Sequence, residues 1–236
     1  MIQRFIDNDP IGILTLLGSR KANPDAKLFI DDPDNPTYLY LSKEGFCSFS
    51  ALNEDAVDRL IPELQKSNLQ FSGVRHKWAN KIVAARGAVW HEPCHLLYYP
   101  KTECEIEILH PVRSLRPEGA ALINEHWKYG EGNAEDHIRE RIEKGPTTAC
   151  DDEEGMVAWN LTHSDGSMGF IHTMERARRK GYAQSVAGAL IRKILDLDET
   201  PFCYVVKGNE ASLDFSAHIG LVHDGESDYL EIKAVE

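Results

Sequence analysis

The order of helical and extended segments after residue 117 constrains the fold more than any other feature of this chain. Pro117 suits the first turn of a helix that reaches Trp127, and Asn133 is placed to cap a second helix that stops at Gly145. The next segments in the sequence are strands at 156–162 and 167–174, a helix at 182–197, a strand at 202–206, a helix at 209–219 and a strand at 228–235. This order mixes a hairpin with crossover connections, so it predicts an α/β (α+β) fold with a mixed, mainly antiparallel sheet flanked by helices.

The helix at 182–197 has the clearest amphipathic pattern. Its apolar stripe consists of Ala183, Val186, Leu190, Ile194 and Leu197. The residues that we place off this stripe are Gln184, Ser185, Gly188, Arg192 and Lys193. The pattern predicts that the stripe packs on the sheet and that the remaining residues face away from it.

The first half of the chain contains a similar mixture of segments. Strands are predicted at 28–30 and 37–41, around the turn-forming residues 31–36. Asn53 is placed to cap a helix whose apolar residues are Val57, Leu60, Ile61 and Leu64, and Pro62 should kink it. Further strands are predicted at 69–73 and 94–99. We see no internal sequence repeat, and we expect a boundary near 111–117 that divides the chain into domains 1–112 and 113–236.

Composition excludes several classes of protein. The 26 basic and 38 acidic residues of the 236-residue chain leave a net charge of −12, so a nucleic-acid partner is not expected. No apolar run is long enough to span a membrane, and the first residues lack a typical targeting pattern. The five scattered cysteines are typical of reduced thiols, so we predict a cytoplasmic protein.

A cationic loop precedes the amphipathic helix. Four basic residues lie between the strand that ends near 174 and Gly181, namely Arg176, Arg178, Arg179 and Lys180. A helix N-terminus offers unpaired N–H groups and partial positive charge, and a glycine lets an anion approach the backbone closely. This loop therefore predicts a site for a polyphosphate-like ligand, although a solvated loop that starts a helix would give the same composition.

The spacing in this loop adds a family resemblance. Arg178-x-x-Gly181-x-Ala183 resembles the acyl-CoA pyrophosphate signature of the GCN5-related N-acetyltransferase (GNAT) superfamily. Downstream, Asn209, Ser212, Phe215 and Gly220 are spaced as in a second segment of that superfamily. The residues that extend the resemblance to the glycine N-acyltransferase family are Ile123–Gly130, Ile138, Ile142, Gly155–Leu161, Asp165–Met168 and His172–Met174. In that family residues 1–112 would form a degenerate GNAT-like half, so the resemblance implies two tandem halves.

The resemblance implies how acetyl-CoA or another acyl-CoA would bind in the C-terminal half. Strands that end at Thr173 and Val206 would splay, and pantetheine would pair with the backbone at Ile171 and Thr173. The residues implied at the pyrophosphate are Arg178, Arg179, Lys180, Gly181, Tyr182, Ala183, Gln184 and Ser185. Asn209 would lie near the pantetheine. The partners would be a small-molecule acyl-CoA and an amine acceptor, and mitochondria become a second compartment to consider.

The proton-transfer residues of the family are replaced in this chain. The position of its glutamate base is Ser167, and the position of the superfamily tyrosine acid is Ser216. His172 is one substitute base, while a hydrogen-bonded core histidine is the plainer interpretation. Glu175 and Glu154 are weaker candidates. Loss of a base slows transfer by about 10²–10⁴-fold without abolishing it, because alignment of the reactants still contributes.

Two further groups of residues have a possible functional role. Trp127 and Tyr129 could line the acceptor pocket, and aromatic core residues would have the same pattern. His91-Glu-Pro-Cys-His95 places metal-ligand residue types together, but Pro93 interrupts the spacing and we expect no metal.

The sequence thus predicts an acyl-CoA-dependent N-acyltransferase that acts on glycine or another small amine. The alternative is an acyl-CoA-binding module with weak or no turnover, because Ser167 and Ser216 replace the usual base and acid.

Overall fold

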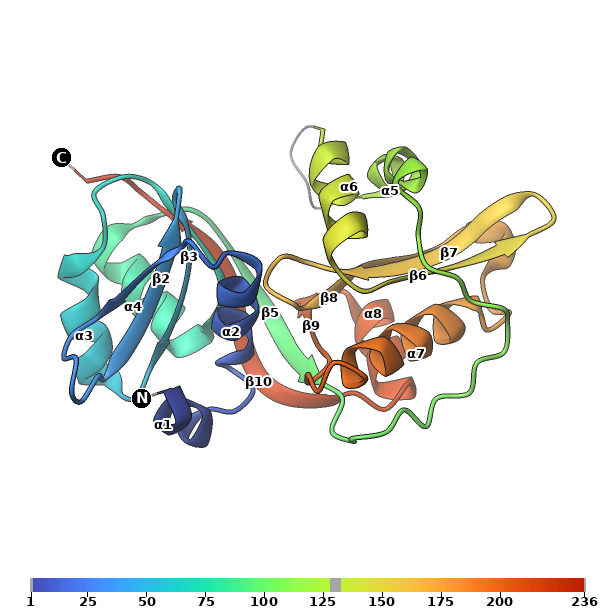
Figure 1. Cartoon of the computed structure of the whole chain (residues 1–236). Coiled ribbons are helices and arrows are strands. Elements are labelled where there is room, and N and C mark those ends of the chain that lie inside the picture. Colours follow the sequence, from blue (N-terminus) through green and yellow to red (C-terminus); the bar gives the residue numbers. More distant parts are fainter. Residues whose placement is uncertain (1, 128–132, 236) are drawn as a thin grey trace. The chain divides into compact units, whose positions relative to one another are not determined.

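The computed structural model describes residues 2–127 and 133–235, and in it the same order of elements occurs twice (Figure 1). Each series runs helix, helix, three strands, helix, strand, helix, strand. The first series consists of α1 (Ile2–Asn8), α2 (Leu14–Ala22), β1 (Lys27–Ile30), β2 (Tyr38–Lys43), β3 (Phe46–Ala51), α3 (Glu54–Glu63), β4 (Leu69–Arg75), α4 (His76–Arg86) and β5 (Ala88–Tyr98). The second consists of α5 (Ala120–His126), α6 (Glu135–Lys144), β6 (Thr147–Asp152), β7 (Gly155–Thr162), β8 (Met168–Thr173), α7 (Tyr182–Leu195), β9 (Phe202–Val206), α8 (Glu210–His218) and β10 (Val222–Ile232), with short 3₁₀ turns at Pro117–Gly119 and Glu175–Ala177.

The chain forms two compact units that differ from the expected domains 1–112 and 113–236. Unit 1 contains the residues up to Leu97, Tyr204–Leu213 and the residues from His223 onward. Unit 2 contains Tyr98–Cys203 and Asp214–Val222. The C-terminal strand belongs to unit 1 because β10 pairs antiparallel with β4, from Ser227 opposite Arg75 to Ile232 opposite Leu69. A boundary in the sequence could not reveal this, since the pairing joins residues more than 150 positions apart.

In unit 1, alternate residues of β2 enter different cores. Tyr38 and Tyr40 pack with α3 and α4, whereas Leu39 packs with α1 and α2. This is the period-two alternation of a strand covered on both faces. Helix α3 begins as predicted, because the Asn53 side chain accepts a hydrogen bond from the amide of Ala56.

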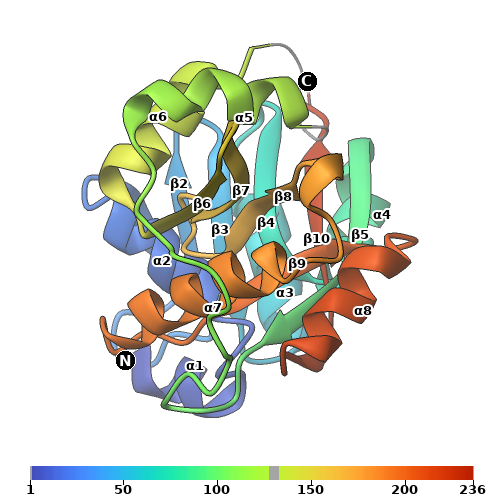
Figure 2. The ribbon, with the colours of Figure 1, turned by 90° about the vertical axis from the view of Figure 1, so that its right-hand side faces the viewer.

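In unit 2, helices cover both faces of the meander β6–β7–β8 (Figures 1 and 2). Helices α5 and α6 pack through Ile123 and Ile138 on the face that holds Trp159. Helix α7 packs through Val186 on the opposite face, against Ala158. The predicted hairpin at 164–166 is confirmed, and Gly166 has the positive φ of 86° that the turn needs.

Two predictions about the amphipathic helix are wrong. Leu197 lies beyond the end of α7 and is 51% exposed. Ser185 and Gly188, which we placed away from the core, are buried because an extended segment covers that side of the helix. This segment, residues 101–112, is called the strap below. Within it Ile106 and Ile108 lie so close to Gly188 that a Cβ there would come within 3.0 Å of both.

Several elements have no sequence prediction. They are α1, α2, β3, α4 and β6, and β10 begins six residues before the strand that we predicted. All five cysteines are free thiols, as expected. No helix among the described residues is both long and apolar enough to cross a membrane.

Candidate functional site

The strand before the cationic loop carries a β-bulge. In β8, Gly169 lies opposite Leu161 of β7 and His172 lies opposite Trp159, so Phe170 and Ile171 share one partner position. Phe170 adopts a φ of 56°, which is unusual for a residue other than glycine. A bulge leaves backbone groups outside the ladder and re-aims the neighbouring side chains, and bulges are enriched beside active sites.

On the side away from β7, the ladder of β8 is short. Among the described residues its parallel pairing with β9 consists of one register pair, Met168 with Cys203. Beyond this pair, the stretch from Gly169 to Thr173 has a ladder partner only on the β7 side. An unpaired strand edge presents N–H and C=O groups that an extended, amide-containing ligand can bind.

The loop after β8 presents a row of free amides. Arg179 and Gly181 both adopt left-handed conformations, with φ values of 61° and 85°. In the part of the chain that the structure describes, the backbone N–H groups of residues 179–184 form no hydrogen bond of good length and angle with another backbone group. The first intrahelical bond of α7 runs from the Ser185 N–H to the Gly181 carbonyl at 3.0 Å, so the Ser185 amide is already used. Successive amides before a helix form an anion-binding concavity, and the helix dipole favours negative charge there.

The four cations of the loop differ in their surroundings. Arg176 is paired with Asp152 at 3.1 Å and with Glu154 at 3.5 Å. Arg178 donates to the Thr173 carbonyl and to Glu175, both at 3.3 Å. These pairs also occupy both acidic residues, Glu154 and Glu175, that the sequence offered as weaker base candidates.

Arg179 and Lys180 have different surroundings from the first two cations. Both side chains are exposed, and no carboxylate of the described chain forms an ion pair with either of them. Their charge is therefore available to a ligand at the amides.

The strap holds the other side of this loop. The Ser185 hydroxyl accepts hydrogen bonds from the amides of Leu109 and His110, at 3.0 and 3.1 Å. The His110 ring stacks on Tyr182, with centroids 3.8 Å apart, and its Nε2 lies 2.6 Å from the Lys180 carbonyl. Gln184 donates to the Glu107 carbonyl at 2.9 Å. The strap thus fixes the first turn of α7 through main-chain and ring contacts that the sequence did not indicate.

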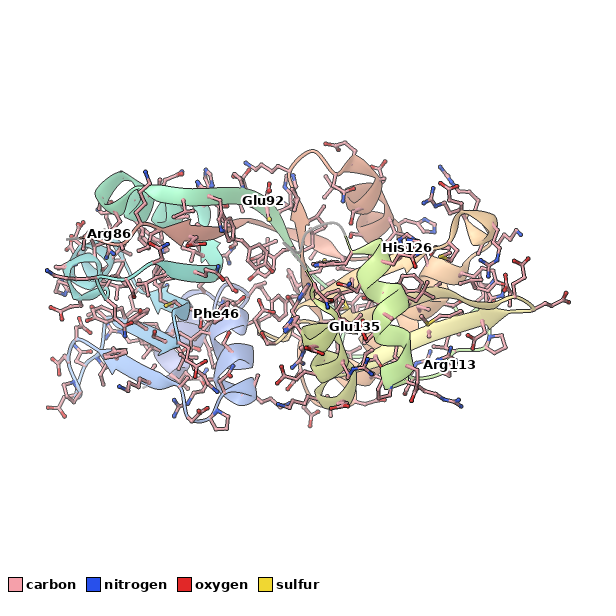
Figure 3. The ribbon with its side chains drawn as sticks, turned by 90° about the horizontal axis from the view of Figure 1, so that it is seen from above. Phe46, Arg86, Glu92, Arg113, His126 and Glu135 are labelled. Atoms are coloured by element: carbon pink, nitrogen blue, oxygen red, sulfur yellow. The ribbon has the colours of Figure 1, made fainter. Side chains whose placement is uncertain are left out.

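His172 lies in a stack of aromatic rings. Its imidazole is 4.8 Å from the Trp159 ring and 4.6 Å from the His126 ring, and both pairs are nearly parallel. His126 is the last residue of α5 and is labelled in Figure 3. Sequence reasoning missed His126, because its only local signal is its place at a helix end.

The two serines that the resemblance places at proton-transfer positions are both buried. The Ser167 hydroxyl donates to Asp165 at 2.6 Å inside the hairpin turn. Ser216, on α8, hydrogen-bonds the thiol of Cys203, whose pKa burial raises to about 12. Both hydroxyls therefore already have hydrogen-bond partners inside the protein.

The remaining predicted site residues are placed as follows. Trp127 packs on Phe170, with ring centroids 4.1 Å apart, and on His163 at 5.8 Å. Tyr129 lies outside the described residues. Asn209 belongs to unit 1, where its side chain accepts from the Ser212 amide and caps α8.

The sequence cluster His91–His95 does not act as one group. Cys94 is buried in the core, and burial raises the pKa of its thiol to about 12. His95 faces His223, with 3.1 Å between their ring nitrogens. His91 instead contacts Asp228, a residue of β10.

Comparison with known proteins agrees with this architecture. Residues 149–229 match the family model described as FR47-like protein. An X-ray structure of a Drosophila protein superposes with a TM-score of 0.73 at 16% identity, over 95% of this chain and 91% of that one. An acetyltransferase of the GNAT family from Colwellia psychrerythraea gives a TM-score of 0.58 at 12% identity, over 98% and 95%. No curated protein matches the chain.

A tandem GNAT protein from the clavulanic acid biosynthesis pathway is also similar. It superposes with a TM-score of 0.54 at 10% identity, over 94% of this chain and 88% of that one. At these identities the likeness shows the fold, which is α/β with a mixed sheet of the GNAT type, as predicted. The doubled order of elements fits the expectation of two tandem halves.

Proposed function

We propose that this protein is an acyl-CoA-dependent N-acyltransferase that transfers an acyl or acetyl group to the amine of glycine or of another small amine. The observation that carries the proposal is the row of free amides at residues 179–184 beside two unpaired cations, Arg179 and Lys180. A diphosphate matches this arrangement, because it offers several acceptor oxygens and more than one negative charge.

The strand that leads into this loop also supports the proposal. Beyond its one register pair with β9, the strand β8 would pair through its backbone with the amides of pantetheine, which is an extended chain. The bulge at Phe170 and Ile171 lies on the same strand, so its displaced backbone groups are candidates to polarise the thioester carbonyl. Both features lie within unit 2 and on consecutive segments of the chain.

Transfer to an amine also requires that the amine be neutral. A lysine-like amine with a pKa of about 10.4 is neutral in roughly one molecule in 2500 at pH 7, so a base accelerates the reaction. His172 is the candidate, and its stacked neighbour His126 is a second imidazole at the same place. A purely structural histidine would form the same stack. The pH–rate profile of a His172→Gln variant distinguishes the two roles.

A second candidate function is favoured by the burial of Ser167 and Ser216. Neither hydroxyl replaces the family's base or acid, since one is held by Asp165 and the other by Cys203. A module that binds acyl-CoA without turnover would keep the amide row and lose these groups.

Calorimetric titration with CoA tests the binding step. We expect one CoA per chain, with affinity that falls as salt is raised. Absence of binding, together with a Gly181→Trp variant that behaves like the wild type, would remove the proposal.

Thiol release, measured over a panel of acyl-CoAs and amines that includes glycine, separates the two candidates. Turnover above background with any pair identifies an enzyme. CoA binding without turnover across the panel identifies the non-catalytic module.

A further inference from the structure

Two imidazoles and one carboxylate from distant parts of the chain converge in unit 1. His76 begins α4, His91 lies on β5 beside Glu92, which Figure 3 labels, and Asp228 lies on β10. Nδ1 of His76 is 2.7 Å and Nε2 of His91 is 2.6 Å from the same atom, Oδ2 of Asp228. We propose that these residues, called the His-Asp-His cluster below, bind one divalent transition-metal ion of the zinc class.

The carboxylate is the first reason. Asp228 is fully buried, and its second oxygen, Oδ1, accepts no hydrogen bond from the described chain. A buried carboxylate oxygen without a partner is costly, because the charged group has lost its hydration and has gained no hydrogen bond in return. A metal ion bound by this carboxylate would compensate its charge and could use the oxygen that the two imidazoles leave unsatisfied.

The donor set is the second reason. The three ligand atoms all lie within 4.8 Å of one another. Zinc binds imidazole nitrogen and carboxylate oxygen at about 2.0–2.2 Å, so its ligand atoms lie roughly 3–3.5 Å apart, and small side-chain rotations would reach that arrangement. Two imidazoles and one carboxylate suit zinc and its neighbours in the transition series better than magnesium or calcium, which prefer oxygen ligands.

The surroundings provide an outer shell. Metal-bound histidines usually hold their second ring nitrogen through a hydrogen bond to a neighbouring group. With Nδ1 of His76 on the metal, Nε2 carries the proton and donates, and the carboxylate of Glu226 lies 3.9 Å from it as an acceptor. Nδ2 of Asn80 lies 2.9 Å from Nε2, so this amide would turn its oxygen toward the ring when the metal is bound. Glu226 is itself held by Lys207 at 2.7 Å.

An ion can also reach the cluster. The side chains of His76 and His91 are 34% and 20% exposed. His76 lines a pocket of about 600 Å³ in unit 1, together with Arg75, Asp224 and Glu226. Three protein ligands leave a fourth tetrahedral position for water or for a ligand from this pocket.

Metal titration of the full chain, freed of metal by a chelator and then dialysed, tests the proposal. We expect one Zn²⁺ per chain by calorimetry, and Co²⁺ bound at the same site should give the visible absorption of a tetrahedral nitrogen–oxygen site. Zn²⁺ should also raise the melting temperature, since binding to the folded state alone stabilises it. His91→Gln and Asp228→Asn should each weaken Zn²⁺ binding by about tenfold or more and remove the Co²⁺ absorption.

The matched control is the double variant His95→Gln/His223→Gln, which removes a second pair of facing imidazoles in the same unit. It should bind Zn²⁺ like the wild type. If Asp228→Asn fails to fold, His91→Gln decides, because this side chain is partly exposed on a strand. The proposal is overturned if the wild-type chain binds no stoichiometric Zn²⁺, or if His91→Gln binds it as tightly as the wild type does.

Discussion

A Cβ atom on Gly181 would lie 2.6 Å from Cδ1 of Leu109, so the strap and the amide row are in direct contact at this glycine. Gly181 also has a φ of 85°, a conformation that other residues adopt only with strain. Both facts mean that a single added methyl group at this position should perturb the candidate site.

Gly181→Ala should weaken CoA binding by about tenfold and lower the free energy of unfolding by about 1–2 kcal/mol, the usual penalty for a left-handed alanine. Calorimetry and chemical denaturation measure the two effects. Gly155→Ala is the control, since Gly155 has a φ of 118° and open space around its Cβ position. An unchanged CoA affinity in Gly181→Ala would contradict the placement of the diphosphate.

The charges of the loop lead to a second prediction. Arg179→Ala and Lys180→Ala should each reduce CoA affinity by about three- to tenfold and flatten its salt dependence, because both remove an unpaired cation. Arg176→Ala is the matched control, since Asp152 and Glu154 already neutralise that side chain. Titrations at two salt concentrations compare the three variants. Equal losses of CoA affinity in all three variants would indicate that the net positive charge of the loop attracts CoA, and would contradict specific contacts from Arg179 and Lys180.

The Ser185 hydroxyl should stabilise the position of the strap. Ser185→Ala leaves the amides of Leu109 and His110 without their acceptor, which should cost about 1–3 kcal/mol of stability. Hydrogen exchange should accelerate at these two amides, while the exposed turn variant Ser164→Ala should leave them protected. Unchanged protection in Ser185→Ala would show that these two amides do not depend on the Ser185 hydroxyl and that the other contacts of the strap suffice to hold it.

The role of His172 depends on a pH profile. If His172 removes a proton from the amine, His172→Gln should lower kcat/KM by about 10²-fold or more and abolish the acidic limb of the pH–rate profile. His126→Gln preserves His172 and removes only its stacking partner, so it should retain that limb. An unaltered profile in His172→Gln would exclude it as the base and assign it to the core.

Acid should destabilise unit 2 through His163. Burial lowers the pKa of His163 from its ordinary 6.5 to about 4, against the opposing effect of Asp165. Between these values the unfolded chain binds a proton that the folded chain does not, so stability falls as the pH is lowered from 6.5 to 4, by about 3 kcal/mol at most.

His163→Phe isolates this contribution. Phenylalanine keeps an aromatic ring beside Trp127 and Phe170 and cannot titrate. Denaturation series at pH 7, 5.5 and 4 should give a shallower decline for the variant than for the wild type. Parallel curves would show that His163 titrates normally in the folded chain.

Local sequence determined several starts and turns in both series of elements, and the character of the candidate loop. The Pro117 and Asn53 helix starts, the turn at 164–166 and the loop of Arg178–Gly181 depend on neighbouring residues, so periodicity, caps and glycine conformations predict them. The likeness of the two halves was not visible in the sequence. A common fold fixes which positions are buried, but many different residues can fill those positions.

Only the tertiary structure decided which surfaces are covered and which side chains meet. Ser185 and Gly188 are polar or small and fall off the apolar stripe of α7, yet they are buried because the strap lies across them. His172 meets His126, and His91 meets Asp228, through pairings across 46 and 137 positions. Such contacts arise from the packing of whole elements, and no short-range pattern encodes them.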